Sequence, residues 1–225
     1  MRVSAILSFA SLVAATPVTF PRASPVEQSL LERQLTRPVA NELTLGPCRS
    51  VIFIFARGTL EIGNMGEIVG PVVADQLKRR LSDEGVAVQG VPYAALVSTN
   101  FLPGGTDPAS MAQMTTLFNL ADTKCPDSVF VVGGYSQGAA VCHRSIEKLP
   151  QRIKDKIKAV VLFGDTQKRA DRNAIPGFDA SRIRFFCDDG LDLVCDGVIA
   201  AAALLPHLSY GAVSAEAGNW LADHV

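Results

Sequence analysis

The chain has 225 residues, which suits a single domain once a leader is removed. Hydrophobic residues make up 48% of the chain and charged residues 19%, a composition that provides one buried core and excludes an intrinsically disordered protein. The formal net charge is −1, so there is no basic surplus to bind nucleic acid or an anionic membrane surface.

The N-terminal segment has the pattern of a secretory signal peptide, expected to cover residues 1–15. Arg2 supplies a positive start, the run to Ala15 carries no charge, and small residues stand where a signal peptidase would cut. The run is too short and too rich in Ser and Ala to span a membrane, and no transmembrane segment is expected elsewhere. Residues 16–38 contain several prolines and scattered charges, which indicates a pro-segment or flexible arm. We therefore expect the folded domain to cover residues 39–225.

Hydrophobic patterning along the domain predicts strands that alternate with helices. Apolar runs predict strands at 50–55, 86–93, 129–132, 157–163 and 182–187. Apolar residues at helical spacing predict helices at 68–81, 110–121, 139–149 and from 214 to the C-terminus. This alternation predicts an α/β fold with a parallel sheet covered by helices on both faces. In such folds the chemistry lies beyond the carboxyl ends of the strands.

Five cysteines occur in a chain that is expected to be secreted, so disulfides are expected. Cys187 and Cys195 bracket a short loop rich in Gly and Asp and should pair. Cys48 and Cys125 each precede a predicted strand, and their pairing would join the starts of neighbouring strands. Cys142 lies in an apolar helical stretch and is predicted to be a buried free thiol. No spacing typical of a zinc site is present, and neither a metal nor another cofactor is expected.

The segment from Gly134 to Gly138 is a G-x-S-x-G motif, with Ser136 at its centre, between a predicted strand and a predicted helix. In this context the serine must lie on a sharp turn that tolerates only small neighbours. The turn presents the hydroxyl at the end of the sheet, near a helix N-terminus where peptide dipoles favour negative charge. Ser136 is therefore the candidate nucleophile, and the alternative is a Gly-rich turn with an incidental serine.

A serine nucleophile needs a base, and the chain has three histidines. His143 lies on the same predicted helix as Ser136, about 10 Å further along its axis, so it cannot take the serine proton. We expect it to be a surface or core histidine. His224 is the penultimate residue. His207 remains as the candidate base, and it fits the chain order of serine, acid and histidine that accompanies this motif.

The acid that orients the base should lie between Ser136 and His207. The candidates are Asp165, directly after the fourth predicted strand, and Asp188, Asp189, Asp192 and Asp196, in or beside the loop between the paired cysteines. A loop closed by a disulfide is a good mount for a carboxylate that must keep one orientation. The loop alone does not separate Asp192 from Asp189.

Several segments together resemble the fungal cutinases, a family of serine esterases. They are 56–59 with Glu61 and 63–64, 133–139, 162–164, 192–195 and 206–210. The resemblance runs from about Cys48 to His224. It implies an α/β-hydrolase, a three-layer sandwich with a central five-stranded parallel sheet and no lid domain. It also implies a secreted monomer that hydrolyses cutin, the plant cuticle polyester, and short- to medium-chain acyl esters through an acyl-enzyme intermediate.

The resemblance implies a role for each candidate residue of the triad. Ser136 would be the nucleophile and His207 the base. Asp192 would be the acid, which resolves the choice that the loop left open. The same resemblance implies the disulfides Cys48–Cys125 and Cys187–Cys195, in agreement with the pairing expected from their positions.

The resemblance further implies an oxyanion hole made by the backbone N–H groups of Thr59 and Gln137, with the Thr59 hydroxyl as a further donor. Asn100 matches the residue that orients this hydroxyl. Many cutinases have serine where this chain has Thr59, whose side chain is stiffer at χ1. The loop between Cys187 and Cys195 is also slightly longer than usual.

The stretch from Cys195 to His207 is slightly longer than in the family too, and there it forms one wall of the acyl groove. The acyl length that the enzyme prefers therefore stays open. Within this stretch 198–205 is uncharged, and with Phe101 and Leu102 it offers an apolar rim suited to a waxy acyl chain. The alternative is that its alanines pack into the core.

Two other functions fit parts of the sequence. An acetylxylan esterase would share the fold and the triad, but one Trp and three Tyr provide few aromatic platforms for a sugar polymer. A non-enzymatic secreted surface or elicitor protein could use the same scaffold, but a complete triad with its oxyanion residues argues against it.

Overall fold

The computed structural model describes residues 36–188 and 191–225. The expected signal peptide, 1–15, and the greater part of the expected arm, 16–35, lie outside the described residues. Nearly all of the expected domain, 39–225, is described.

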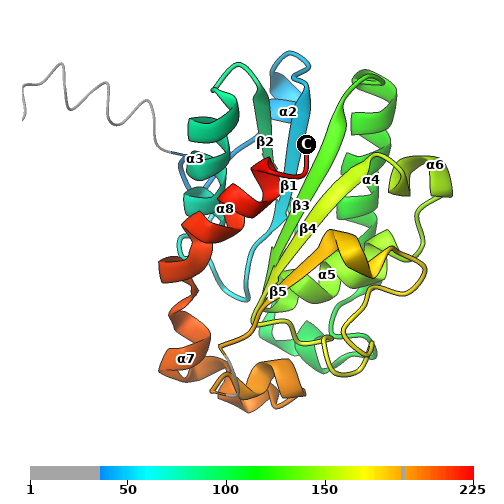
Figure 1. The fold of residues 1–225 in the computed structure, drawn as a ribbon. Coiled ribbons are helices and arrows are strands. Elements are labelled where there is room, and N and C mark those ends of the chain that lie inside the picture. The colour runs from blue at the N-terminus through cyan, green and yellow to red at the C-terminus, as the bar shows by residue number, and fades with distance from the viewer. Residues whose placement is uncertain (1–35, 189–190) are drawn as a thin grey trace, which may run out of the picture. The chain divides into compact units, whose positions relative to one another are not determined.

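A parallel sheet of five strands forms the centre of the domain, in the order β2-β1-β3-β4-β5 (Figure 1). The strands are β1 (Val51–Ala56), β2 (Val86–Gly90), β3 (Val129–Tyr135), β4 (Ile157–Phe163) and β5 (Ile183–Phe186). Every neighbouring pair is parallel. The predicted α/β fold with a five-stranded parallel sheet is therefore confirmed.

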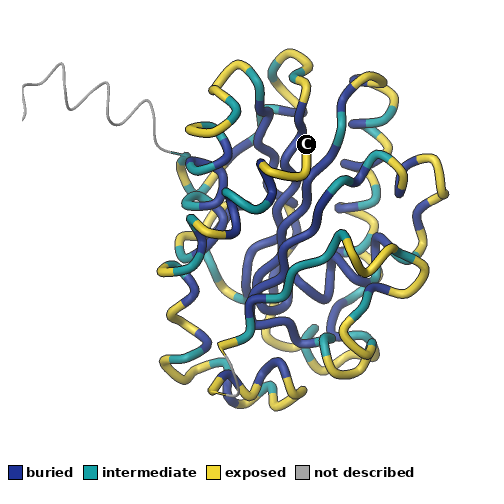
Figure 2. The backbone as a smooth tube through the Cα atoms, viewed as in Figure 1, coloured by how far each residue is buried: buried dark blue, intermediate teal, exposed yellow. Residues whose placement is uncertain are grey.

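Helices cover both faces of this sheet (Figure 1). One face is covered by α3 (Gly70–Leu81) and α8 (Ser214–Ala222), and the other by α4 (Pro108–Lys124) and α5 (Gln137–Ile146). Alternate residues of β1 serve the two cores: Phe53 and Phe55 pack on the α3 side, and Ile52 and Ile54 on the α5 side. All of β1 is buried, as a strand covered on both faces must be (Figure 2).

Short elements complete the domain. They are the helices α2 (Glu42–Leu45), α6 (Gln151–Lys154) and α7 (Leu205–Leu208), and the 3₁₀ turns η1 (Val97–Phe101), η2 (Ala180–Arg182), η3 (Leu193–Asp196), η4 (Ile199–Ala203) and η5 (Tyr210–Val213). None of them was predicted from the sequence, because three to five residues are too few to show a periodic pattern. Those between β5 and α8 form the end of the molecule where the site lies.

The predicted helices are present, but their ends differ from the predicted ones by a few residues. α4 begins at Pro108 because the Asp107 carboxylate caps it, accepting from the N–H groups of Ala109 (2.9 Å) and Ser110 (3.0 Å). α5 begins at Gln137, directly after the motif serine, and not at 139. This difference matters for the site, because the first N–H groups of α5 then lie beside the serine.

The two disulfides that were expected, Cys48–Cys125 and Cys187–Cys195, are formed, with sequence separations of 77 and 8 residues. Among the described residues Cys142 is a free and buried cysteine. Burial, together with the negative charge of Asp165, raises the pKa of the Cys142 thiol well above its usual value, so the thiol is neutral. The helices of the described part of the chain are all too short or too polar to cross a membrane.

Candidate active site

Ser136 lies on a sharp turn between β3 and α5. Its backbone has φ 56° and ψ −119°, a conformation that costs a residue with a side chain on the order of 1–3 kcal/mol. The turn needs a close approach of α5 to the sheet, and Gly138 provides it: a Cβ on this residue would lie 2.0 Å from the carbonyl oxygen of Ala56. The second glycine of the motif, Gly138, is therefore required by the close packing of α5 against the sheet.

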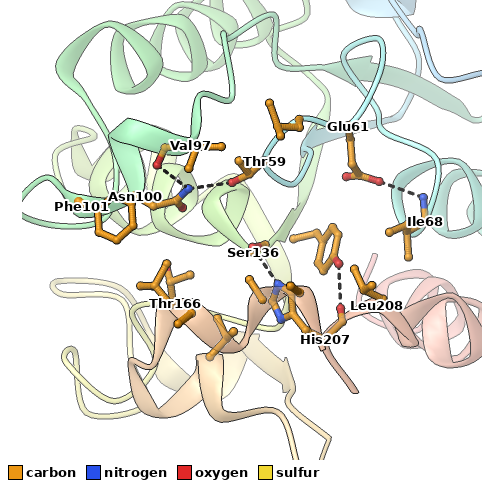
Figure 3. A pocket seen from close by; sticks show the side chains of 17 residues that line it. Thr59, Glu61, Ile68, Val97, Asn100, Phe101, Ser136, Thr166, His207 and Leu208 are labelled. Carbon is orange, nitrogen blue, oxygen red and sulfur yellow. Dashed lines mark hydrogen bonds between the residues drawn. The ribbon is translucent and has the colours of Figure 1, made fainter. Parts of the chain in front are cut away.

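Hydrogen bonds join Ser136, His207 and Asp192 in series. His207 Nε2 lies 2.9 Å from Ser136 Oγ (Figure 3), and His207 Nδ1 lies 2.8 Å from Asp192 Oδ2. All three residues are buried, with exposed fractions of 6% for Ser136, 3% for Asp192 and 2% for His207. When Nδ1–H donates to the carboxylate, Nε2 carries the lone pair and accepts the serine proton.

Asp192 directly precedes η3 and is held by several donors. Its Oδ1 accepts from the N–H of Val194 (3.0 Å), and its Oδ2 accepts from the hydroxyl of Tyr210 (2.6 Å) as well as from His207. The bond to Val194 fixes the carboxylate to the start of the 3₁₀ turn. Asp192 therefore reaches the imidazole from a rigid mount.

The other acid candidates that lie in the described part of the chain do not reach His207. Asp188 and Asp196 are exposed, and Asp189 lies outside the described residues. Asp165 is buried, but it binds His143 and not His207. Asp192 is distinguished from these candidates by its tertiary contacts, which the sequence of the loop alone does not reveal.

Gly164 leaves the space that the imidazole occupies. It follows β4 and has φ +50°, and a Cβ there would lie 2.5 Å from His207 Cε1 and 3.0 Å from Asp192 Oδ2. The residue belongs to one of the segments that resemble the cutinases, but its contact with the imidazole was not predicted.

Thr59 and Asn100 line the same cavity as Ser136 (Figure 3). Asn100 Nδ2 donates to Thr59 Oγ1 (3.0 Å). Since an amide NH₂ group only donates, the Thr59 hydroxyl accepts from it and keeps its own proton for another acceptor. The backbone N–H of Gln137, the first residue of α5, has no partner within the helix. The Gln137 side chain instead donates to the carbonyl of Leu96 (2.8 Å).

Glu61 holds the loop that carries Thr59. Its carboxylate accepts from the N–H groups of Gly58 (2.7 Å), Glu67 (2.9 Å) and Ile68 (3.0 Å); the last of these bonds is drawn in Figure 3. One side chain thus satisfies three backbone donors across the loop. Glu61 belongs to one of the segments that resemble the cutinases, but this role was not predicted from the sequence.

An open, mostly apolar cavity of about 450 Å³ lies above Ser136. Its apolar lining includes Leu60, Val97, Phe101, Ile199, Ala202, Ala203 and Leu208. Several large apolar side chains that line the cavity are exposed, among them Leu60, Phe101 and Leu208. The stretch at 198–205 is divided between the two predicted alternatives, because Ala201 is buried while Leu204 and Leu205 face solvent. A shaped apolar cavity with a few converging polar groups suits a ligand with an acyl chain.

His143 is a core histidine, and it lies between two carboxylates. Its Nε2 is 2.8 Å from Asp165 Oδ2, and its Nδ1 is 2.7 Å from Asp171 Oδ2. Arg144 also binds Asp171. The cluster ties α5 to the segment that follows Gly164, and it was not predicted from the sequence.

In the described part of the chain no cluster of His, Cys, Asp or Glu side chains is arranged to hold a metal ion. The chemistry available at this site is that of an alcohol, an imidazole, a carboxylate and backbone donors. Together with the topology of the sheet, this arrangement defines a hydrolase of the α/β-hydrolase class.

A family model for the cutinases matches residues 47–225. The chain is 45% identical to probable cutinase 3 of Neosartorya fischeri over 221 residues, which cover 97% of this chain and 99% of that relative. It is 46% identical to cutinase 1 of Fusarium vanettenii over 206 residues, covering 89% and 87% of the two chains. The chain therefore belongs to the cutinase family of carboxylic ester hydrolases, and the resemblance read from the sequence is confirmed.

The solved structures that match this chain include a cutinase and a more distant esterase that shares the fold. A Trichoderma reesei cutinase in complex with a phosphonate inhibitor matches with a TM-score of 0.71 and 34% identity, over 88% of this chain and 83% of that chain. An acetyl xylan esterase matches with a TM-score of 0.60 but only 19% identity, over 79% and 97% of the two chains. The second match shows a shared fold and nothing about substrate.

Replacing Gly164 by alanine should lower kcat for ester hydrolysis by about 100-fold, because the new methyl group displaces the imidazole of His207. Gly177→Ala is the matched control: its φ is +68°, and the nearest atom to an added Cβ is the flexible end of Lys154 at 3.3 Å. Both variants carry a similar backbone cost of about 1–2 kcal/mol. Equal activity of the two folded variants, measured on a chromogenic ester, would contradict the assigned contact.

Replacing His143 by glutamine should lower the free energy of unfolding by about 1–3 kcal/mol, because it removes a hydrogen-bond partner of the buried Asp165 carboxylate. His224→Gln is the control, since that histidine is exposed near the C-terminus. We expect the control to change stability by less than about 0.5 kcal/mol. Urea unfolding followed by circular dichroism measures both, and a His143→Gln protein as stable as the control would refute the structural role of His143.

Proposed function

We propose that the protein is a secreted serine esterase that hydrolyses the ester bonds of cutin and of short- to medium-chain acyl esters through an acyl-enzyme intermediate. The observation that carries this proposal is the unbroken series of hydrogen bonds from Ser136 through His207 to Asp192 at the floor of an apolar cavity. The names of the related proteins supply the polyester as substrate.

In the proposed mechanism Ser136 Oγ attacks the ester carbonyl carbon while His207 Nε2 takes its proton. Asp192 stabilises the imidazolium that forms. The N–H groups of Thr59 and Gln137, with the Thr59 hydroxyl, donate to the oxyanion, and each such donor is worth about 2.7–4 kcal/mol of barrier. The imidazolium gives its proton to the departing alcohol, and water then cleaves the acyl-enzyme by the same steps.

The surroundings of Ser136 support a lipid-like substrate. Four large apolar side chains that line the cavity are exposed: Leu60, Val97, Phe101 and Leu208. A protein that exposes so many apolar groups in one region gains free energy when they meet an apolar surface. The open cavity then lets a chain from that surface reach the serine.

The expected processing and location form part of the proposal. Residues 1–15 would act as the signal peptide, 16–38 as a pro-segment or arm, and 39–225 as the catalytic domain. Two disulfides suit a protein of an oxidising compartment. The enzyme would act as a monomer without a cofactor.

Replacing Ser136 by alanine should lower ester hydrolysis by about 10⁵–10⁶-fold, because no other group can form the acyl-enzyme. The wild-type protein should be labelled by an alkyl phosphonate on Ser136, and mass spectrometry of the peptides locates the adduct. Full hydrolysis by the purified Ser136→Ala protein, or an adduct elsewhere, would end the proposal.

Replacing Ala202 by phenylalanine should narrow the cavity and lower the ratio of long-chain to short-chain ester hydrolysis by about tenfold. Ala180→Phe is the control, because Ala180 is exposed and precedes β5, at the end of that strand remote from the site. The wild-type enzyme should release monomers from cutin and little acetate from acetylated xylan. Preference for the xylan would favour an acetylxylan esterase in place of a cutin hydrolase.

A further inference from the structure

The hydroxyl of Tyr210 contacts the acid of the triad. It lies 2.6 Å from Asp192 Oδ2, the same oxygen that accepts from His207 Nδ1 at 2.8 Å. Two donors therefore share one carboxylate oxygen. The Tyr210 hydroxyl stabilises part of the negative charge of the Asp192 carboxylate. The attraction between this carboxylate and the imidazole of His207 is weaker as a result.

The direction of this hydrogen bond follows from the second partner of the hydroxyl. The N–H of Asp188 donates to the Tyr210 oxygen (3.2 Å) and occupies one of its lone pairs. A carboxylate can only accept, so the single hydroxyl proton points at Asp192. Burial, and then the bond to Asp192, raise the pKa of the Tyr210 phenol well above its usual value, so the group remains a donor throughout the neutral range.

Tyr210 is placed to act on the triad without contacting substrate. It lies three residues after His207, a spacing that brings side chains to one side of a helical segment. Its ring packs edge-on against the imidazole, with the ring centres 6.1 Å apart. The side chain is 2% exposed and does not line the cavity above Ser136. It faces instead a second cavity of about 460 Å³ on the β5 side of the triad.

We propose that Tyr210 is a positioning residue of the esterase reaction, whose hydroxyl holds the Asp192 carboxylate in line with His207 and moderates its negative charge. The inference rests on the proposed function of the triad. With two donors on Oδ2 the carboxylate orients the imidazole but does not hold the imidazolium proton too tightly. The proton can then pass to the departing alcohol.

The test is Tyr210→Phe, which removes one oxygen and keeps the packed ring. We expect kcat to fall about three- to tenfold with KM changed less than about twofold, because the substrate does not touch this residue. The acid limb of the kcat/KM profile should move to higher pH by about half a unit, because the less stabilised carboxylate binds the imidazolium more strongly. A purely structural role would lower the melting temperature and leave the limb in place.

Tyr135→Phe is the matched control. The Tyr135 ring stacks on the same imidazole with centres 5.3 Å apart, but its hydroxyl donates to the backbone carbonyl of His207 (2.8 Å) and not to the carboxylate. The acid limb should therefore stay within about 0.2 of a pH unit of the wild-type position. An equal displacement of the limb in both tyrosine variants would overturn the inference.

A substitution that strengthens the donor tests the same idea without removing a group. With 3-fluorotyrosine at position 210 the phenol is more acidic, so the acid limb should move to lower pH. If the acid limb of the kcat/KM profile keeps its wild-type position in both the Tyr210→Phe and the fluorotyrosine proteins while Ser136→Ala is inactive, the role of Tyr210 is refuted and the proposed function stands. An active Ser136→Ala protein would refute the proposed function itself.

Discussion

The site depends on one buried negative charge, the carboxylate of Asp192. A carboxylate taken out of water is costly unless donors replace the solvent, and here a backbone N–H, a phenol and an imidazole do so. These donors come from η3, from η5 and from α7, so the carboxylate also joins these three short elements. Without them the carboxylate would lose its fixed position, and His207 would lose its orientation.

The strained turn at Ser136 is the second condition for the site. Its cost is small beside the stability gained from β3, which packs against both cores of the domain, and from α5, which packs against one. The turn therefore persists, and it places the hydroxyl and the first N–H groups of α5 on one side. Glu61 fixes the loop that carries Thr59 by satisfying its backbone donors. The proposed reacting groups and oxyanion donors are thus held in place before substrate arrives.

Much of this arrangement could be predicted from local patterns. The apolar runs predict the strands because strands covered on both faces leave no room for polar residues, and Ser136 follows from a motif with a fixed backbone context. His207 follows by elimination among few histidines. The acid does not follow from local patterns, because Asp188, Asp189, Asp192 and Asp196 have similar local sequences. The family resemblance selects Asp192, and in the structure its contacts with Tyr210 and His207 set it apart. The partners of His143 were missed for the same reason, since they lie 22 and 28 residues away.

The smaller disulfide, Cys187–Cys195, closes a ring of the chain that contains Asp192. The proposed catalytic acid is therefore mounted on a covalent loop that exists only after two thiols have been oxidised. A newly made chain in a reducing compartment carries every proposed reacting group, yet lacks the link that keeps one of them in place. In the proposed secreted enzyme, oxidation during export would act as a maturation step, which spares the producing cell's own esters from a finished hydrolase.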